Sequence, residues 1–146
     1  FYIFEVTKMA THTGHSGVVT VGGNAVAEVK DFSIEVTANT VDATTLNASA
    51  ADAGWTKTKV TNRSWSVSIN CFFDDAAGNG QDDMSNNINQ SATAMLANAG
   101  VSISCEAGGD TFAGDVLITS MSESVSGDGL VEVSFTATGL GALTIS

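Results

Sequence analysis

Apolar and polar residues alternate along several stretches of this chain, which is the period-two pattern of a half-buried β-strand. The alternation is clear in segments 32–37, 101–105 and 131–136. It is strongest in segment 64–73, where every second residue is apolar: Trp65, Val67, Ile69, Cys71 and Phe73. The pattern predicts a mainly β domain whose strands turn one face to the core and one face outward.

Glycine-rich turn signals divide the weaker β patterns. Gly22-Gly23-Asn24 separates two short expected strands, 18–21 and 25–29, and such a sequence favours a tight hairpin turn. A second turn is expected at 106–110, before the strands of the last third of the chain. The glycine-rich segment 138–144 is expected to be a tail.

Helical spacing replaces the alternation in the middle of the chain. Over about 83–99 apolar residues recur every three or four positions, at Met84, Ile88, Ala92, Met95 and Ala99. This is the pattern of an α-helix with one apolar face. Gly100 closes the segment, and Asp82 or Asp83 is the expected N-cap. A single apolar stripe predicts a helix that flanks the sheet and covers its edge or end.

A long connection joins the first two strong strand patterns. Residues 40–60 are polar, rich in small side chains and short of turn signals. Loops of this length inside a domain are uncommon and are usually functional or ordered by a partner. We therefore expect an extended hairpin arm that reaches a neighbouring copy, with contacts from Thr40, Val41, Asp42, Thr44, Thr45, Trp55, Lys57, Lys59 and Arg63.

Trp55 and three nearby basic residues are the most distinctive side chains of this arm. A large aromatic beside a polar loop is either an anchor in its own domain or a hot spot at an interface. Lys57, Lys59 and Arg63 are three of the five basic residues in the chain. They are either solvated charges, which contribute little each, or partners of an acidic face on a neighbouring copy.

The charge of the chain excludes one class of function. Sixteen acidic and five basic residues give a formal net charge of −11. Five basic residues cannot form a face that neutralises several phosphates, which excludes a nucleic-acid-binding domain. A negative surface serves solubility, and it also suits a conduit along which DNA slides without adhering. No apolar run has the length needed to cross a bilayer, so no membrane partner is expected.

No constellation of residues points to catalysis or to a bound metal. The sequence lacks a Ser-His-Asp order in a known context, a GxSxG motif and a phosphate-binding loop, so we expect neither an enzyme nor a cofactor. His12 and His15 have no third ligand nearby. Segment 74–83 matches a calcium loop only in part, because its third position and its terminal carboxylate are missing.

The two cysteines allow two interpretations. Cys71 and Cys105 lie in alternating apolar runs, where small buried thiols are common. A disulfide would form between them if the chain matured outside a cell. The buried-thiol interpretation is favoured.

The length of 146 residues fits one domain with a substantial core. That single β-domain is expected over 17–146. Residues 1–16 carry no comparable pattern and are expected to be an N-terminal arm or extension.

Three passages, in a fixed order along the chain, resemble the major tail protein (tail tube protein) family of long-tailed bacteriophages. The resemblance extends from about Val29 to Thr144. The passages are TVDATT (40–45) followed by Gly54-Trp55, SWSVSI (64–69) running into Asp74-Asp75, and DTFAGDVLITS (110–120) with VEVSFTATG (131–139).

The resemblance implies a fold and a structural role. The implied fold is an antiparallel β-sandwich or barrel with one flanking α-helix and a long extended hairpin arm. Copies would form rings, usually hexameric, that stack into a hollow tube, with the arm and the terminal segments linking rings. Other tail proteins would bind the tube ends, and genome DNA would pass through the lumen without specific binding. The protein would belong to the virion tail and assemble in the host cytoplasm.

Two alternatives stay open, and the first of them shares this architecture. One is the tube subunit of a contractile injection machine. The other is a secreted or surface β-module of a filament or adhesin, which an oxidised Cys71–Cys105 pair would favour.

Overall fold

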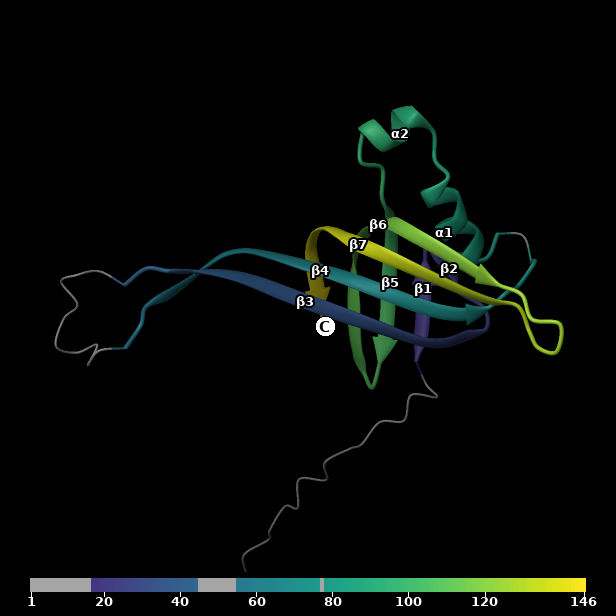
Figure 1. Ribbon diagram of the computed structural model, residues 1–146, viewed down its shortest axis with the longest axis horizontal. Helices are drawn as coiled ribbons and strands as arrows, with labels where there is room; N and C mark the ends of the chain where they lie inside the picture. The colour runs from purple at the N-terminus through teal and green to yellow at the C-terminus, as the bar shows by residue number, and fades with distance from the viewer. Residues whose placement is uncertain (1–16, 45–54, 77) are drawn as a thin grey trace, which may run out of the picture.

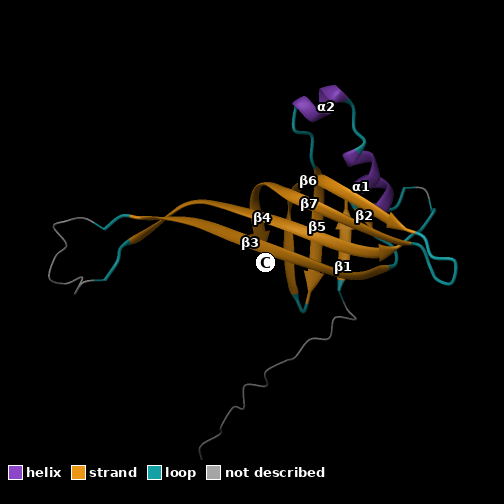
Figure 2. Ribbon diagram, in the orientation of Figure 1, coloured by secondary structure: helices purple, strands orange, loops and turns teal. Residues whose placement is uncertain are grey.

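The computed structural model describes residues 17–44, 55–76 and 78–146, and over these residues the chain is mainly β. The expected N-terminal arm, 1–16, lies outside the described residues. All strand pairs are antiparallel and join one sheet in the order β2-β1-β5-β6-β7-β4-β3 (Figures 1 and 2). The elements are β1 (Val18–Val21), β2 (Asn24–Ala25), β3 (Val29–Asp42), β4 (Thr58–Phe72), α1 (Gly80–Ile88), α2 (Ala92–Leu96), β5 (Val101–Ala107), β6 (Asp110–Ser124) and β7 (Glu132–Ile145).

The sheet folds over itself because β6 and β7 are long and bent. The first half of β6, Asp110–Val116, pairs with β5, whereas its second half pairs with β7 alone. Register shifts between Ala113 and Asp115 and between Ile118 and Ser120 mark two irregularities in the β6–β7 ladder, and bulges of this kind bend a strand and increase its twist. The layer of β3, β4 and β7 therefore runs across the layer of β1 and β5 (Figure 2). This confirms the predicted sandwich-like β architecture.

The core lies between the two layers. The alternation of segment 64–73 is confirmed, because Trp65, Val67, Ile69 and Cys71 are all buried. The facing layer and the remaining strands contribute Val19, Val21, Ile103, Cys105, Val116, Ile118, Val133, Phe135 and Ala137. Each aliphatic side chain of this size contributes about 1.5–3 kcal/mol on full burial, so this shared core holds the layers together.

Trp65 occupies a slot made by two glycines. Its indole Nε1 donates a hydrogen bond to the Gly141 carbonyl oxygen at 3.0 Å. A methyl group on Gly139 would lie 2.2 Å from Cε2 of the indole, and one on Gly114 would lie 2.6 Å from Cζ2. The ring therefore rests directly on the backbone of β6 and β7, which explains why glycine occupies both positions.

The helical region is present but divided. Helix α1 begins at Gly80, with Asn79 as its N-cap, because the Asn79 side chain accepts a hydrogen bond from the Asp82 N–H. The expected cap, Asp82 or Asp83, lies instead in the first turn. Asn89, Gln90 and Ser91 interrupt the helix, and the Ser91 side chain caps α2 by accepting from the Ala94 N–H. Asparagine and serine side chains form hydrogen bonds with nearby backbone groups and so compete with the hydrogen bonds of the helix. They therefore favour cap positions over helix interiors.

Helix α1 packs on the sheet through Met84, which is fully buried, and Ile88. Helix α2 buries no residue, and Met95 and Leu96 are exposed. The predicted packing of the apolar stripe on the sheet is therefore correct for the first half of the region and wrong for the second.

Three strand boundaries differ from the predictions. The strand expected at 25–29 is the two-residue β2, which follows a Gly22-Gly23 turn with φ values of 60° and 83°. The expected tail 138–144 belongs to β7, which keeps its pairing with β6 beyond the left-handed Gly141. Phe73 lies just past the end of β4 and is exposed.

Both cysteines are free and buried, which confirms the buried-thiol interpretation. Burial raises the pKa of the Cys71 thiol from 9.0 to about 11, and burial raises the pKa of Cys105 to the same value. The thiolate is disfavoured because the core cannot solvate its charge.

Substitution of Gly139 by alanine tests the Trp65 slot. The added methyl group forces the indole or β7 to shift, so Gly139→Ala should lower the free energy of unfolding by about 1–3 kcal/mol and Tm by about 3–10 °C. Gly127→Ala is the matched control, since nothing lies within 4 Å of a methyl group there, and it should change stability by less than about 0.5 kcal/mol. Equal melting temperatures for the two variants would show that the slot is not tight.

The raised thiol pKa values predict slow cysteine labelling and a loss of stability in alkali. At pH 8 the folded-state thiolate population should be about 100-fold below that of the unfolded chain, because the pKa differs by about two units. Reaction with a disulfide reagent should slow by at least that factor. The stabilisation is complete below pH 9 and is lost as pH rises toward 11, since the folded-state pKa is the higher one. Fast labelling of the native protein would contradict the burial.

Candidate assembly surfaces

Strands β3 and β4 continue well beyond the core as a two-stranded ribbon (Figure 1). The last buried side chain on this path is Trp65, opposite Val36. The pairing then continues to Asp42 opposite Thr58, and the Ala43 N–H donates to the Lys57 carbonyl oxygen at 2.8 Å. We call residues 37–44 and 55–64 the ribbon; all but Ala43 are exposed. The predicted hairpin arm is thus present as paired strands over its described part.

The structure places nearly all the predicted arm residues on this ribbon. Thr40, Val41 and Asp42 lie at the end of β3, and Lys59 and Arg63 lie on β4. Thr44, Trp55 and Lys57 follow at the far end, and Thr45 lies outside the described residues together with the expected arm tip, 46–54.

Hydrogen bonds tie the far end of the ribbon together. The Thr44 hydroxyl oxygen accepts from the Lys57 N–H at 2.9 Å, and the Asp42 Oδ1 accepts from the Thr44 N–H at 2.8 Å. Hydrogen bonds from the Thr44 side chain and backbone hold the pKa of the Asp42 carboxyl below its usual value. The two strands therefore stay paired far from the core, beyond the register shift between Asn39 and Thr40.

Large apolar side chains remain uncovered on the ribbon and beside it. Val36, Val41 and Val60 are about half exposed, and Trp55 is 78% exposed. Trp55 is therefore no anchor in the described part of its own domain, and the interface interpretation stays a hypothesis. An isolated two-stranded hairpin is marginally stable in water, so this ribbon gains from any surface that covers it.

Among the open strand edges of the described residues, two border the four strands β3-β4-β7-β6. Strand β3 ends the sheet, and its outer edge faces no other described strand. The second half of β6 pairs with β7 on one side only. Asn87 of α1 accepts from the Ile118 N–H at 2.9 Å, which leaves Thr119–Ser124 as the open part of that edge. Such edges are templates for pairing with another chain.

The face of β3, β4 and β7 that points away from the core is lined by small polar side chains. Ser134 Oγ donates to Asn70 Oδ1 at 2.7 Å, and Asn70 in turn donates to Asp31. Lys30 and Glu132 form an exposed ion pair at 3.2 Å. We call this surface the polar face; its other members include Ser33, Glu35, Ser66, Ser68 and Thr136.

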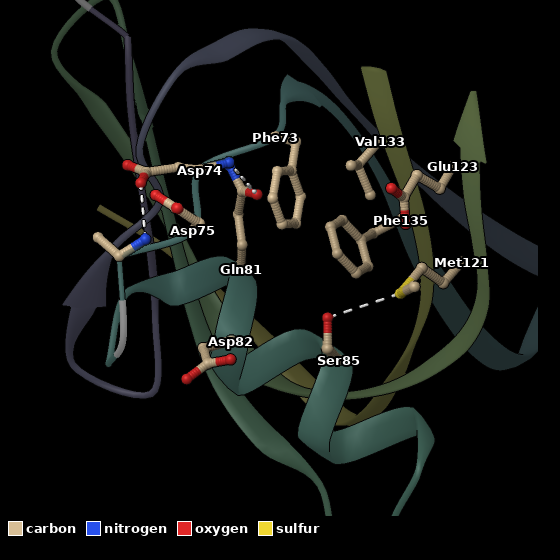
Figure 3. Close-up of a pocket in the computed structure, with 11 residues that line it drawn as sticks. Phe73, Asp74, Asp75, Gln81, Asp82, Ser85, Met121, Glu123, Val133 and Phe135 are labelled. Atoms are coloured by element: carbon tan, nitrogen blue, oxygen red, sulfur yellow. Dashed lines mark hydrogen bonds between the residues drawn. The ribbon is translucent and has the colours of Figure 1, made fainter. Parts of the chain in front are cut away.

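A groove lies between α1 and the ends of β4, β6 and β7 (Figure 3). The pocket in it has a volume of about 180 Å³. Its walls include the exposed Phe73 and Met121 and the buried Val133 and Phe135. Four acidic residues also line it, Asp74, Asp75, Asp82 and Glu123. The Asp74 and Asp82 carboxylates accept hydrogen bonds from the backbone N–H groups of Ala76 and Gly78. We call this feature the α1 groove.

Gln81 holds one end of the α1 groove in place. Its side chain is buried, its Nε2 donates to the carbonyl oxygens of Ala27 and Phe72, and its Oε1 accepts from the Asp74 N–H. Sequence reasoning missed Gln81, because a glutamine in the first turn of a helix carries no pattern that separates it from a solvated one. From the sequence, the acidic segment 74–83 was compared with a calcium-binding loop. The sequence did not indicate that this segment forms one wall of the α1 groove.

The described residues contain neither a metal-binding cluster nor a membrane-spanning helix. No three His, Cys, Asp or Glu side chains gather there in a way that could hold a metal ion. No described helix is long and apolar enough to cross a membrane.

Comparison with known proteins gives matches in structure but not in sequence. No family model matches the chain, and no curated protein matches it. A protein of the native gene transfer agent virion matches with a TM-score of 0.69 and 20% identity, over 93% of this chain and 99% of that one. A chain of the sheath–tube complex of the extracellular contractile injection system PVC matches with a TM-score of 0.66 and 12% identity, over 95% and 93%.

The tail tube of phage SPP1 matches with a TM-score of 0.60 and 12% identity, over 88% of this chain and 76% of that one. A further match is the tail of the empty gene transfer agent particle, a C6-symmetric assembly, with a TM-score of 0.62 and 21% identity over 84% and 85%. The chain therefore shares its fold with subunits of phage-like tails and injection tubes.

Hydrogen exchange should distinguish the ribbon from the core. In the unassembled protein, amides at 37–42 and 58–63 should exchange at least about 100-fold faster than those at 67–71, because a two-stranded segment without a covered face opens easily. Mass spectrometry of peptic fragments measures this. Equal protection of the ribbon and the core would contradict the description of the ribbon as uncovered.

Proposed function

We propose that the protein is a structural virion subunit that polymerises as stacked rings into a phage tail tube, a conduit for DNA delivery. The observation that carries this proposal is the pair of open edges on the four strands β3-β4-β7-β6. The shared fold with tail and tube subunits supports it. The role is structural and needs no catalytic group.

The strand directions allow copies to join into a ring. Neighbouring strands alternate in direction across β3, β4, β7 and β6, so β3 and β6 run in opposite directions. When a second copy is placed beside the first, its β3 lies antiparallel to the open part of β6. The sheet of these four strands then continues from copy to copy, and ring closure covers the open part of β6 and the part of β3 that faces it. A hexameric ring is expected from the family resemblance.

The polar face is assigned to the lumen of the ring. The second layer and α1 cover the opposite face of these strands (Figure 2). Because these elements need space, they fit on the outer side of a closed ring and not in its lumen. Asp31, Glu35 and Glu132 make the polar face acidic, and Lys30 offsets one of these charges. Small hydroxyl groups and excess negative charge give DNA few sites for adhesion.

The ribbon is assigned to the contact between rings. It projects along the strand direction (Figure 1), whereas ring closure uses the direction of the inter-strand hydrogen bonds. Other tail proteins are expected at the tube ends, and the assembled protein is expected in the virion tail. The tube of a contractile injection machine is the second candidate, since the PVC chain shares this fold over almost the whole of its length.

Electron microscopy of the purified protein tests this function. At rising concentration the protein should form hollow filaments of stacked rings, because each added copy covers two strand edges. Negative staining shows the filaments and the number of subunits in a ring. A protein that stays a single particle at millimolar concentration would rule the function out.

A variant that replaces residues 45–54 with Asn-Gly serves as the matched control. The two residues form a hairpin turn, so the domain should stay folded while tubes no longer form. Tubes of normal length from this variant would show that residues 45–54 are not needed to link rings.

A further inference from the structure

The α1 groove has the chemistry of a receptor for a basic, aromatic segment. Phe73 and Met121 expose apolar surface at the pocket, and Phe135 and Val133 form its floor (Figure 3). Within the described residues the one ion pair is Lys30–Glu132, so the four carboxylates of the groove have no cationic partner there. A volume of about 180 Å³ is smaller than that of small-molecule sites, which hold about 300–1,000 Å³, and suits a single large side chain.

The ribbon carries a segment with the complementary chemistry. Trp55 is 78% exposed, and tryptophan is one of the residues enriched among interface hot spots. Lys59 lies four residues away on the same strand path and is exposed. It forms no ion pair with any described carboxylate. An acidic chain with five basic residues thus places several of them beside one exposed aromatic.

The ribbon cannot fill the α1 groove of its own copy. Strand β4 has 15 residues; at about 3.3 Å per residue it separates the two features by about 45–50 Å. The ribbon lies at the start of β4 and Phe73 follows its end, so the two features lie at opposite ends of the molecule (Figure 1). A contact between them must join two copies, and a head-to-tail contact of this kind repeats along one direction.

We propose that the α1 groove of one copy binds the ribbon of a copy in the next ring, with Trp55 in the pocket and Lys59 beside its carboxylates. This proposal rests on the proposed function, because it identifies the surface that receives the arm between stacked rings. The occupant is a second copy of this chain. The apolar pocket supplies affinity, and the carboxylates select the basic ribbon and fix its orientation.

Two changes in the ribbon and one pair of changes in the groove test the proposal. Trp55→Ala removes the anchor, Lys59→Glu reverses the ribbon charge, and Asp75→Lys with Glu123→Lys reverses the groove charge. Each should raise the critical concentration for filament growth by at least about tenfold, the factor expected for loss of one hot-spot contact. Light scattering measures growth, and circular dichroism shows that each protein stays folded.

Mixing two variants gives the decisive comparison. In an equimolar mixture of the Lys59→Glu chain and the groove variant, the acidic ribbon of the first meets the basic groove of the second. The mixture should therefore assemble at least several-fold better than the Lys59→Glu chain alone. The matched control, Glu106→Lys with Asp110→Lys, makes the same charge change on the β5–β6 hairpin and should leave the critical concentration within about twofold of the wild type.

The outcomes separate this proposal from the function on which it rests. Filaments that form normally in all groove and ribbon variants, with Trp55 still open to acrylamide quenching in the wild-type filament, would overturn the docking while the tube remains. Failure of the mixture to assemble better than the Lys59→Glu chain would also overturn it. If the wild-type protein formed no rings or filaments, the tube itself would be refuted and the docking with it.

Discussion

Unpaired backbone hydrogen-bonding groups along two strand edges are the constraint on which the rest of this structure depends. The chain contains no proline, and β3 and β6 extend over 14 and 15 residues in spite of their bulges. Neither charged side chains nor a covering helix protect the full length of either edge. Most soluble proteins block such edges. Here the simplest way to satisfy them is a second copy whose opposite edge runs in the opposite direction. The polar face, the outward core layer and the projecting ribbon are all consistent with that solution.

In the proposed tube, strand β4 couples the two directions of growth. Across the strand, its ladders with β3 and β7 form the centre of the sheet that is proposed to close into a ring. Along the strand, its first residues form the ribbon and its last residue adjoins the α1 groove. Trp65 divides the strand into a ribbon part and a core part, since the glycines of β6 and β7 hold it in place. A stable core thus supports an exposed segment, which the proposed contact between rings would cover.

Much of the fold could be predicted from the sequence, because strand alternation reports directly which face is buried. The core residues of β4, the Gly22-Gly23 turn and the extended arm follow from local patterns. The division of the helix could not be predicted from spacing, since the apolar period continues through Asn89–Ser91 while the polar side chains there cap the backbone. The end of the chain looked like a tail because its glycines, which seat Trp65, are explained only by contacts far away in sequence. The α1 groove combines three distant segments, so no single stretch indicated it.

The central claim is that the β3 edge of one copy pairs with the β6 edge of the next. A helical cryo-electron microscopy reconstruction of the assembled protein, at a resolution that shows main-chain carbonyls, measures this most directly. The account predicts main-chain hydrogen bonds between β3 and residues 119–124 of the neighbouring copy, within one continuous antiparallel barrel that turns the polar face to the lumen. Copies joined by side chains alone, with both strand edges open to water, would contradict it.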